Sequence, residues 1–304
     1  MSGTHTRIDD FVAAVHTPFG KDGSFNGSVI AAQASHLMRE GLRWVFVGGS
    51  TGECQSLTAE ERRELAAAWA EACAGSEMRY VIHVGSNCLD EAVSLAGQAE
   101  SLKAHAIAAF APSYFKPDTM ASLVDWCGTI ADAAPGTPFY FYDIPSMTGV
   151  NLSMSAFLRT GADRMPTLAG LKYTNADQVM MQECLRLAEG RYEILWGMDE
   201  VLLGALALGV NGAVGSTYNM AGPIARRVWD YFEEGRMEDA RREQYRLVTL
   251  VRACARHGYM ASARAVMEKL GVPLGPPRPP FHPLSGAQEK ALFCELEALG
   301  FLKG

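Results

Sequence analysis

Leu168-Ala169-Gly170-Leu171-Lys172 is a short apolar run that ends in a lysine. A similar run, Phe139-Tyr140-Phe141-Tyr142, ends in a tyrosine 30 residues before Lys172. Short, nearly continuous apolar runs are typical of strands in a parallel sheet that is covered by helices. A lysine at the end of such a strand can act as an amine nucleophile, because an apolar environment disfavours its ammonium form and lowers its pKa. The stretch therefore indicates a parallel sheet and Schiff-base chemistry on a carbonyl substrate.

Eight apolar runs of this kind recur along the chain. They are Phe11 to Val15, Trp44 to Val47, Tyr80 to Val84, Ala106 to Phe110, Phe139 to Tyr142, Leu168 to Lys172, Glu193 to Trp196 and Gly212 to Gly215. The segments between them predict helices over about 58–74, where Thr58-Ala59-Glu60-Glu61 is a capping-box signature, and over 90–103, 119–133, 177–188 and 200–208. This alternation favours an α/β fold, a (β/α)8 TIM barrel, with a doubly wound open sheet as the alternative.

Beyond the eighth run the pattern predicts only helices, over 224–234, 238–257, 261–270 and 288–299. The proline-rich segment 275–283 interrupts them, since proline cannot continue a helix. We expect it to be a packed connector rather than a docking ligand. The chain is accordingly divided into a barrel core with the active site, residues 8–222, and residues 223–304, which hold the last barrel helix and a C-terminal helical extension.

Composition limits the possible partners. The net charge of −7 over 304 residues argues against nucleic acid or an anionic membrane surface. The seven cysteines are scattered and never form Cys-x-x-Cys, so neither a disulfide framework nor a zinc site is indicated. The N-terminus has no secretory signal, and no apolar segment reaches the roughly 18 residues of a membrane helix. We expect a cytoplasmic enzyme with a small-molecule substrate.

Polar residues follow several of the predicted strands, at the end of a barrel where active sites lie. Lys172 and Tyr142 share this end, where a phenol near an imine can shuttle protons. The loop Gly48-Gly49-Ser50-Thr51-Gly52-Glu53 can bring backbone N–H groups and two hydroxyls to a carboxylate. It lacks the lysine of a P-loop, which disfavours a nucleotide. Each of these features also has a purely structural interpretation. The Lys172 ammonium can reach water, Tyr142 can be a core tyrosine, and the loop can be a turn that caps the next helix.

Five further positions allow two interpretations. Asp199 and Glu200 either begin a helix or bind substrate hydroxyls. Ser216 and Thr174 can bond a hydroxylated substrate or cap turns. His83, inside a strand, is expected to be an interior histidine rather than a base. No cluster of histidine and acidic residues has metal-ligand spacing.

Several motifs occur in a fixed order between about Phe11 and Gly222. They are Thr17-Pro18-Phe19, Gly49-Ser50-Thr51-Gly52-Glu53, Tyr142-x-Ile144-Pro145-x-x-Thr148-Gly149, Gly170-x-Lys172, Gly197-x-Asp199-Glu200 and Gly215-Ser216. Together they resemble the pyruvate-dependent class I aldolase family that contains dihydrodipicolinate synthase and N-acetylneuraminate lyase. The resemblance implies an imine between Lys172 and the keto carbon of pyruvate or of a larger 2-keto acid. It also implies that no metal or organic cofactor is needed and that the protein is a homotetramer.

The resemblance assigns roles to the other residues of this set. Tyr142 is the proton shuttle, and Ser50 and Thr51 hold the substrate carboxylate. Ser50 also relays protons to Tyr142. Tyr114 aligns with a tyrosine that supports this relay in some members.

Two positions bear on the choice of substrate. Met147 stands where dihydrodipicolinate synthases carry an arginine that clamps a second carboxylate, so a diacid is disfavoured. Asp143 follows the tyrosine where asparagine or histidine is usual, and it adds negative charge near an anionic ligand.

The motifs after the seventh and eighth strands are similar to those of sialic acid lyases. By that likeness Thr174 contacts the hydroxyl at the bond that is cleaved. The polyol tail of the sugar is bound by Gly197, Asp199, Glu200, Gly215 and Ser216. Carboxylates that accept hydrogen bonds from several hydroxyls suit such a substrate.

These observations predict reversible cleavage of N-acetylneuraminate, a sialic acid, to N-acetylmannosamine and pyruvate. One alternative is an aldolase of the same family that acts on 2-keto-3-deoxy sugar acids or 4-hydroxy-2-oxoglutarate. Another is a catalytically silent homologue that binds a small acid and serves regulation.

Overall fold

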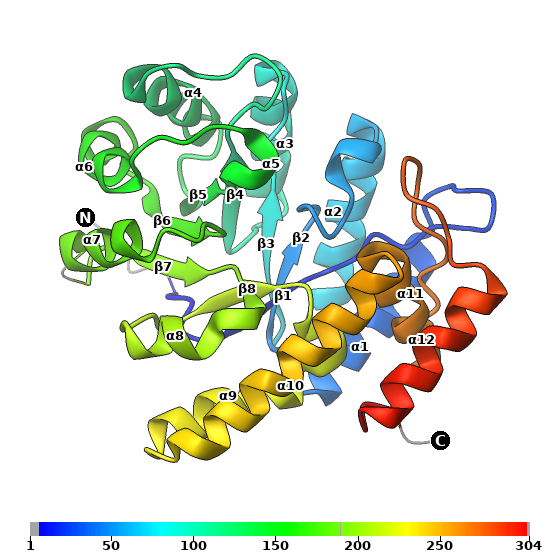
Figure 1. Cartoon of the computed structure of the whole chain (residues 1–304). Coiled ribbons are helices and arrows are strands. Elements are labelled where there is room, and N and C mark those ends of the chain that lie inside the picture. Colours follow the sequence, from blue (N-terminus) through cyan, green and yellow to red (C-terminus); the bar gives the residue numbers. More distant parts are fainter. Residues whose placement is uncertain (1–5, 189, 303–304) are drawn as a thin grey trace.

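Eight parallel strands form a closed barrel in sequence order (Figure 1). The computed structural model describes residues 6–188 and 190–302. The strands are β1 Phe11–Ala14, β2 Trp44–Val47, β3 Arg79–His83, β4 Ala106–Phe110, β5 Phe139–Asp143, β6 Leu168–Tyr173, β7 Glu193–Trp196 and β8 Ala213–Gly215. Because β1 pairs in parallel with β8, the predicted TIM barrel is confirmed and the open sheet is wrong.

Helices surround the strands in Figure 1. Those of the barrel are α1 Ile30–Arg39, α2 Ala59–Cys73, α3 Leu89–Ser101, α4 Met120–Asp132, α5 Pro145–Thr148, α6 Met154–Arg164, α7 Gln178–Ala188, α8 Leu202–Ala207 and α9 Tyr218–Glu233. The sequence analysis did not single out α1, α5 or α6. Helix α6 contains Thr160 and Gly161, which have low helix propensity. It is fixed instead by a hydrogen bond from the N–H of Ala156 to the Ser153 side chain and by packing against α4 and α7.

Alternate residues of the strands face opposite sides of the barrel wall. One buried cluster fills the interior and includes Val12, Phe46, Phe110, Tyr142 and Leu195. A larger cluster lies between the strands and the helices. The interior is therefore a packed core, and polar chemistry is confined to the ends of the barrel.

Three helices form the C-terminal extension: α10 Met237–Arg256, α11 Tyr259–Lys269 and α12 Gly286–Ala298. Helices α10 and α11 pack on α9, and α12 packs on α10 and α11, on the side of the barrel away from α4 (Figure 1). The chain after α11 returns to the barrel, where the N–H of Phe19 donates to the carbonyl of Leu274 over 2.9 Å. The first part of the connector packs there, since Pro277 is buried and Arg278 is half-buried, whereas residues 279–283 are exposed. The expected packing is thus found only for residues 275–278. The predicted division after residue 222 stays a prediction, and α9 runs across it with a kink at Ala221.

The helices were also compared with the length and hydropathy that a membrane span needs. Within residues 6–188 and 190–302, none of them is both long and apolar enough to cross a membrane.

Gly170 tests the packing of the barrel wall. A Cβ atom at this position would lie 1.9 Å from the backbone oxygen of Glu193 on the neighbouring strand, a clash with backbone that cannot move aside. We expect Gly170→Ala to abolish the soluble, folded protein. In the control Gly97→Ala, inside α3, the new Cβ would lie 3.7 Å from the nearest atom, and stability should rise by about 0.5–1 kcal/mol. Circular dichroism melting of both variants measures this, and a folded Gly170→Ala protein would contradict the packing.

Candidate active site

Lys172 and Tyr142 are direct register partners on β6 and β5, so their side chains share the interior face of the barrel. Both are buried. The Lys172 Nζ lies 3.9 Å from the centroid of the Tyr142 ring and 4.0 Å from that of Phe46. The structure therefore brings together the two residues that the sequence placed at the same barrel end, and it adds Phe46, which the sequence analysis gave no role.

The surroundings of Lys172 favour its neutral amine. Burial lowers the pKa of Lys172 to about 7, and the negative charge of Asp199 acts in the opposite direction. At this pKa about half of the molecules carry Lys172 as the neutral amine near neutral pH, so a nucleophile is available without a separate base.

Ser50 connects the Gly-Gly-Ser-Thr-Gly-Glu loop with the tyrosine. Its Oγ lies 3.3 Å from the Tyr142 hydroxyl, and either oxygen can be the donor. Burial raises the pKa of Tyr142 to about 12, and the hydrogen bond with Ser50 opposes this rise only in part. Tyr142 is therefore a neutral phenol at pH 7, able to pass a proton while it receives one from Ser50. Thr51 follows Ser50 on the same loop and is partly buried.

Glu53 ends this loop and fixes its shape. Its backbone has a φ of 54°, a conformation that few residues other than glycine adopt. Its buried carboxylate accepts hydrogen bonds from Arg264 Nε over 3.1 Å and Nη2 over 2.5 Å, and Arg264 also donates to the carbonyls of Thr17 and Leu274. The loop with Ser50 and Thr51 is thus tied to α11.

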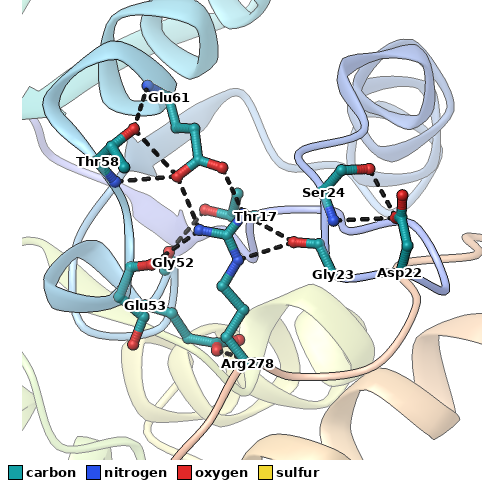
Figure 2. Close-up of polar contacts among 10 residues, drawn as sticks. Thr17, Asp22, Gly23, Ser24, Gly52, Glu53, Thr58, Glu61 and Arg278 are labelled. Atoms are coloured by element: carbon teal, nitrogen blue, oxygen red, sulfur yellow. Dashed lines mark hydrogen bonds and ion pairs between the residues drawn. The ribbon is translucent and has the colours of Figure 1, made fainter.

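Arg278 makes a second connection between the C-terminal segment and the loop, shown in Figure 2. Its backbone N–H donates to Glu53 Oε2 over 2.8 Å, and its guanidinium donates to Glu61 and to the carbonyl of Gly23. The hydrogen bond with Arg278 lowers the pKa of Glu61 to about 2. Glu61 also completes the predicted capping box with Thr58 at the start of α2. Residues 23, 53 and 61 are therefore held together by one residue of the C-terminal segment, through its backbone N–H and its side chain.

Asp199 lies at the end of β7, on the other side of the barrel mouth. It is buried, and its Oδ2 accepts from the N–H of Thr217 over 2.9 Å. Burial, and next the Asp199 carboxylate, hold the pKa of Tyr218 well above its ordinary value, which places the Tyr218 hydroxyl beside Asp199. Burial raises the pKa of Asp199 to about 6. Gly215 allows this position, because a Cβ there would lie 1.8 Å from Asp199 Oδ1.

A cavity of about 340 Å³ adjoins Asp199. It is lined by Gly197, Asp199, Glu200, Ser216, Thr217, Val251, Ala255 and Tyr259. Four of the five residues predicted to bind a polyol tail therefore line one space, and Gly215 lies directly behind it. The lining residues from α10 and α11 were missed by the sequence analysis, because no local pattern links these helices to the barrel mouth.

Thr174 lies directly after β6 and next to Gly197. A Cβ on Gly197 would lie 1.9 Å from the Thr174 Oγ1, so glycine is required for this approach. The Thr174 hydroxyl is buried, and it lies near enough to the Tyr142 hydroxyl to oppose, together with Ser50, the rise in the pKa of Tyr142 that burial causes. It therefore faces the Lys172–Tyr142 pair.

Asp143 was expected to lie near the ligand, but its side chain points away from the barrel interior. Tyr142 points into the barrel, so the next residue points outward, and Asp143 accepts a hydrogen bond from Asn175 Nδ2 over 3.0 Å. Burial raises the pKa of Asp143 to about 6. The expectation that this carboxylate adds charge beside an anionic ligand is therefore wrong.

Tyr114 and Met147 lie at the rim. Tyr114 is 78% exposed, and its ring contacts that of Phe115 rather than the Ser50–Tyr142 pair. Its predicted supporting role stays a prediction. Met147 lines a second, smaller cavity of about 280 Å³ with Ser50, Phe110, Ile144 and Phe281, among others.

His83 lies inside the barrel beside Phe110 and Tyr142. Its Nδ1 is 3.0 Å from the carbonyl of Gly48, while its Nε2 is buried without a partner in the described chain. Burial and the charges of Arg62 and Lys172 hold its pKa well below the ordinary value. His83 is thus the interior histidine that was expected, although only one of its nitrogens is bonded.

Two larger cavities lie at the opposite end of the barrel. They have volumes of about 730 and 690 Å³ and adjoin Trp44 and His105, and Ile8 and Glu193, respectively. That end of a TIM barrel contributes stability rather than chemistry. Nowhere in residues 6–188 and 190–302 do three or more His, Cys, Asp or Glu side chains gather as metal ligands.

Comparison with known proteins identifies the family. A profile described as the dihydrodipicolinate synthetase family matches residues 7–299. The chain belongs to this family. It is 36% identical over 296 residues to the N-acetylneuraminate lyase of Danio rerio, with 96% of both chains covered. The family resemblance that the motifs predicted is confirmed.

Two solved structures agree with this result. The N-acetylneuraminate lyase of Aliivibrio salmonicida superposes with a TM-score of 0.93 at 36% identity, covering 97% of both chains. That of Proteus mirabilis has a TM-score of 0.94 at 33% identity, covering 98% of this chain and 100% of the other.

The pH dependence of imine formation tests the surroundings of Lys172. Because the amine is the reactive form, the rate of borohydride-trapped pyruvate imine should rise with pH through a midpoint of about 7. Asp199→Asn removes a charge that stabilises the ammonium, so its midpoint should move to lower pH. Asp125→Asn, on the exposed face of α4, is the control and should not move it. An upward shift in Asp199→Asn, or a native midpoint near that of free lysine, would contradict the assignment.

The Glu53–Arg264 pair can be tested by stability. Arg264→Met leaves the buried Glu53 carboxylate without its partner and should cost about 3–5 kcal/mol of unfolding free energy, measured in urea. The double variant Glu53→Gln/Arg264→Met should recover part of this loss. Arg43→Met removes an exposed ion pair with Glu77 and should change stability by less than about 1 kcal/mol. Equal stability of Arg264→Met and the native protein would refute the role of the pair.

Proposed function

We propose that the protein is a class I aldolase, a carbon–carbon lyase, that cleaves N-acetylneuraminate reversibly to N-acetylmannosamine and pyruvate. The observation that carries the proposal is the desolvated Lys172 amine in contact with Tyr142, in a chain similar throughout its length to N-acetylneuraminate lyases. The cavity lined by Asp199, Glu200 and Ser216 supports a polyhydroxylated substrate.

The chemistry begins at the amine. Lys172 Nζ attacks the keto carbon of the open-chain sugar, and the carbinolamine loses water to form a protonated imine, with Tyr142 as the proton donor. The bond between the methylene carbon next to the imine and the hydroxyl-bearing carbon after it then breaks, and its electrons form the double bond of an enamine. The hydroxyl on that second carbon gives its proton to Tyr142, and the carbon becomes the aldehyde carbon of N-acetylmannosamine. Protonation of the enamine and hydrolysis of the imine release pyruvate. No metal or organic cofactor takes part in this sequence.

The substrate carboxylate and the polyol tail bind on different sides of the barrel mouth. Ser50 and Thr51 hold the carboxylate, and Ser50 relays protons to Tyr142. The Thr174 hydroxyl, which lies beside Tyr142, contacts the hydroxyl at the bond being cleaved. Gly197, Asp199, Glu200, Gly215 and Ser216 bind the polyol tail.

The assembly and its location complete the proposal. By family resemblance we propose a homotetramer in the cytoplasm. The adjacent rings of Tyr114 and Phe115, 78% and 85% exposed in the single chain, support an interface at this loop, since large exposed apolar groups favour contact with a partner.

A 2-keto-3-deoxy sugar acid is the second candidate substrate, because its hydroxyls would also suit the cavity beside Asp199. 4-Hydroxy-2-oxoglutarate is less suited, since Met147 offers no cation to a second carboxylate. A silent homologue would not need a desolvated lysine beside a proton relay.

Pyruvate release from N-acetylneuraminate, coupled to lactate dehydrogenase, tests the proposal. Native protein should turn over, and Lys172→Ala should lose activity by at least about a thousandfold, because the covalent intermediate cannot form. Lys290→Ala, on the exposed part of α12, should retain full activity. Preference of the native protein for a shorter 2-keto acid would select the alternative, and pyruvate binding with no turnover of any substrate would select the silent homologue.

A further inference from the structure

Tyr259 is the first residue of α11, in the C-terminal extension, yet its hydroxyl lies at the end of β8. The chain turns from α10 into α11 at Gly258, whose φ of 93° is open to glycine and strained for other residues. This turn directs Tyr259 toward the barrel mouth, where it lines the cavity beside Asp199.

The Tyr259 hydroxyl joins two hydroxyls of the β8 loop. It lies 2.7 Å from Ser216 Oγ and 3.3 Å from Thr217 Oγ1. The N–H of Thr217 in turn donates to Asp199 Oδ2. A phenol has one proton and two acceptor positions, so the hydroxyl directions at Ser216 and Thr217 depend on it.

The cavity combines acceptors with an apolar wall. Asp199 and Glu200 supply carboxylates, whereas Val251 and Ala255 of α10 supply the apolar side. Glu200 is half-buried and lines this cavity, so the site has an acceptor to offer. Two carboxylates disfavour an anionic group here, while a neutral chain of hydroxyls can donate to both.

We infer that Tyr259 is a positioning residue that orients the Ser216 hydroxyl toward the polyol tail of the substrate. This inference rests on the proposed function and deepens it. Burial raises the pKa of Tyr259 above its ordinary value, so the phenol keeps its proton across the working range of the enzyme. The simpler role is that Tyr259 only anchors α11 to the start of α9, in which case its hydroxyl would affect stability but not the choice between ligands.

Tyr259→Phe separates these roles, because it removes the hydroxyl and keeps the ring. In the synthetic direction, with saturating pyruvate, KM for N-acetylmannosamine should rise about three- to tenfold, the effect of one neutral hydrogen bond. The pyruvate concentration that gives half-maximal imine trapping should stay within about twofold, since pyruvate has no polyol tail. Tyr245→Phe, an exposed tyrosine of α10, is the matched control and should change neither quantity.

A double-variant comparison tests whether Tyr259 acts through Ser216. Ser216→Ala should raise KM for N-acetylmannosamine at least as much as Tyr259→Phe, and the double variant should be no worse than Ser216→Ala. Additive losses, an unchanged KM in Tyr259→Phe, or an equal rise in the pyruvate requirement would overturn the positioning role. Native protein that traps pyruvate but neither cleaves N-acetylneuraminate nor uses N-acetylmannosamine would instead overturn the proposed substrate, and the assignment of Tyr259 with it.

Discussion

The buried ion pair between Glu53 and Arg264 joins parts of the chain that are 211 residues apart. Glu53 holds a left-handed backbone conformation that costs roughly 1–2 kcal/mol for a residue with a Cβ atom. Glycine would remove this strain, but it would leave Arg264 buried without an anion, a larger penalty. The side chain therefore determines the conformation, and through it the placement of Ser50 and Thr51. The C-terminal extension therefore supports the loop that carries Ser50 and Thr51 in the candidate site.

The charges and burial around Lys172 Nζ affect both its free amine and the protonated imine that the proposed reaction forms from it. Burial disfavours the Lys172 ammonium, which makes the amine available for attack. In the proposed mechanism, the imine formed at Lys172 carries the positive charge that drives bond cleavage. The faces of Phe46 and Tyr142 and the nearby Asp199 charge all favour a cation at that position. Partial desolvation thus weakens the ammonium without excluding the protonated imine.

Local pattern was sufficient for the barrel and for the residues at its strand ends. Every strand begins and ends within one residue of its predicted bounds, because each is buried on both sides and therefore continuously apolar. The alternation of strand side chains would also have placed Asp143 outward once Tyr142 was taken as inward. Arg264 and Tyr259 could not be predicted in this way. Both side chains reach the site from α11. The local sequence around them does not predict which loop of the barrel the extension packs against.

The distribution of charge around the two cavities of the mouth limits the substrate. One cavity is formed by the loops after β7 and β8 with α10 and α11, and the other by the loops after β2, β4 and β5 with the C-terminal connector. Among the described residues that line them there is no lysine or arginine, whereas Asp199 and Glu200 are acidic and the charge of Glu53 is paired with Arg264. A second carboxylate would therefore lose its hydration without gaining a cation. A monoanion whose carboxylate stays beside Ser50, and whose remaining length is neutral and hydroxylated, meets no such penalty.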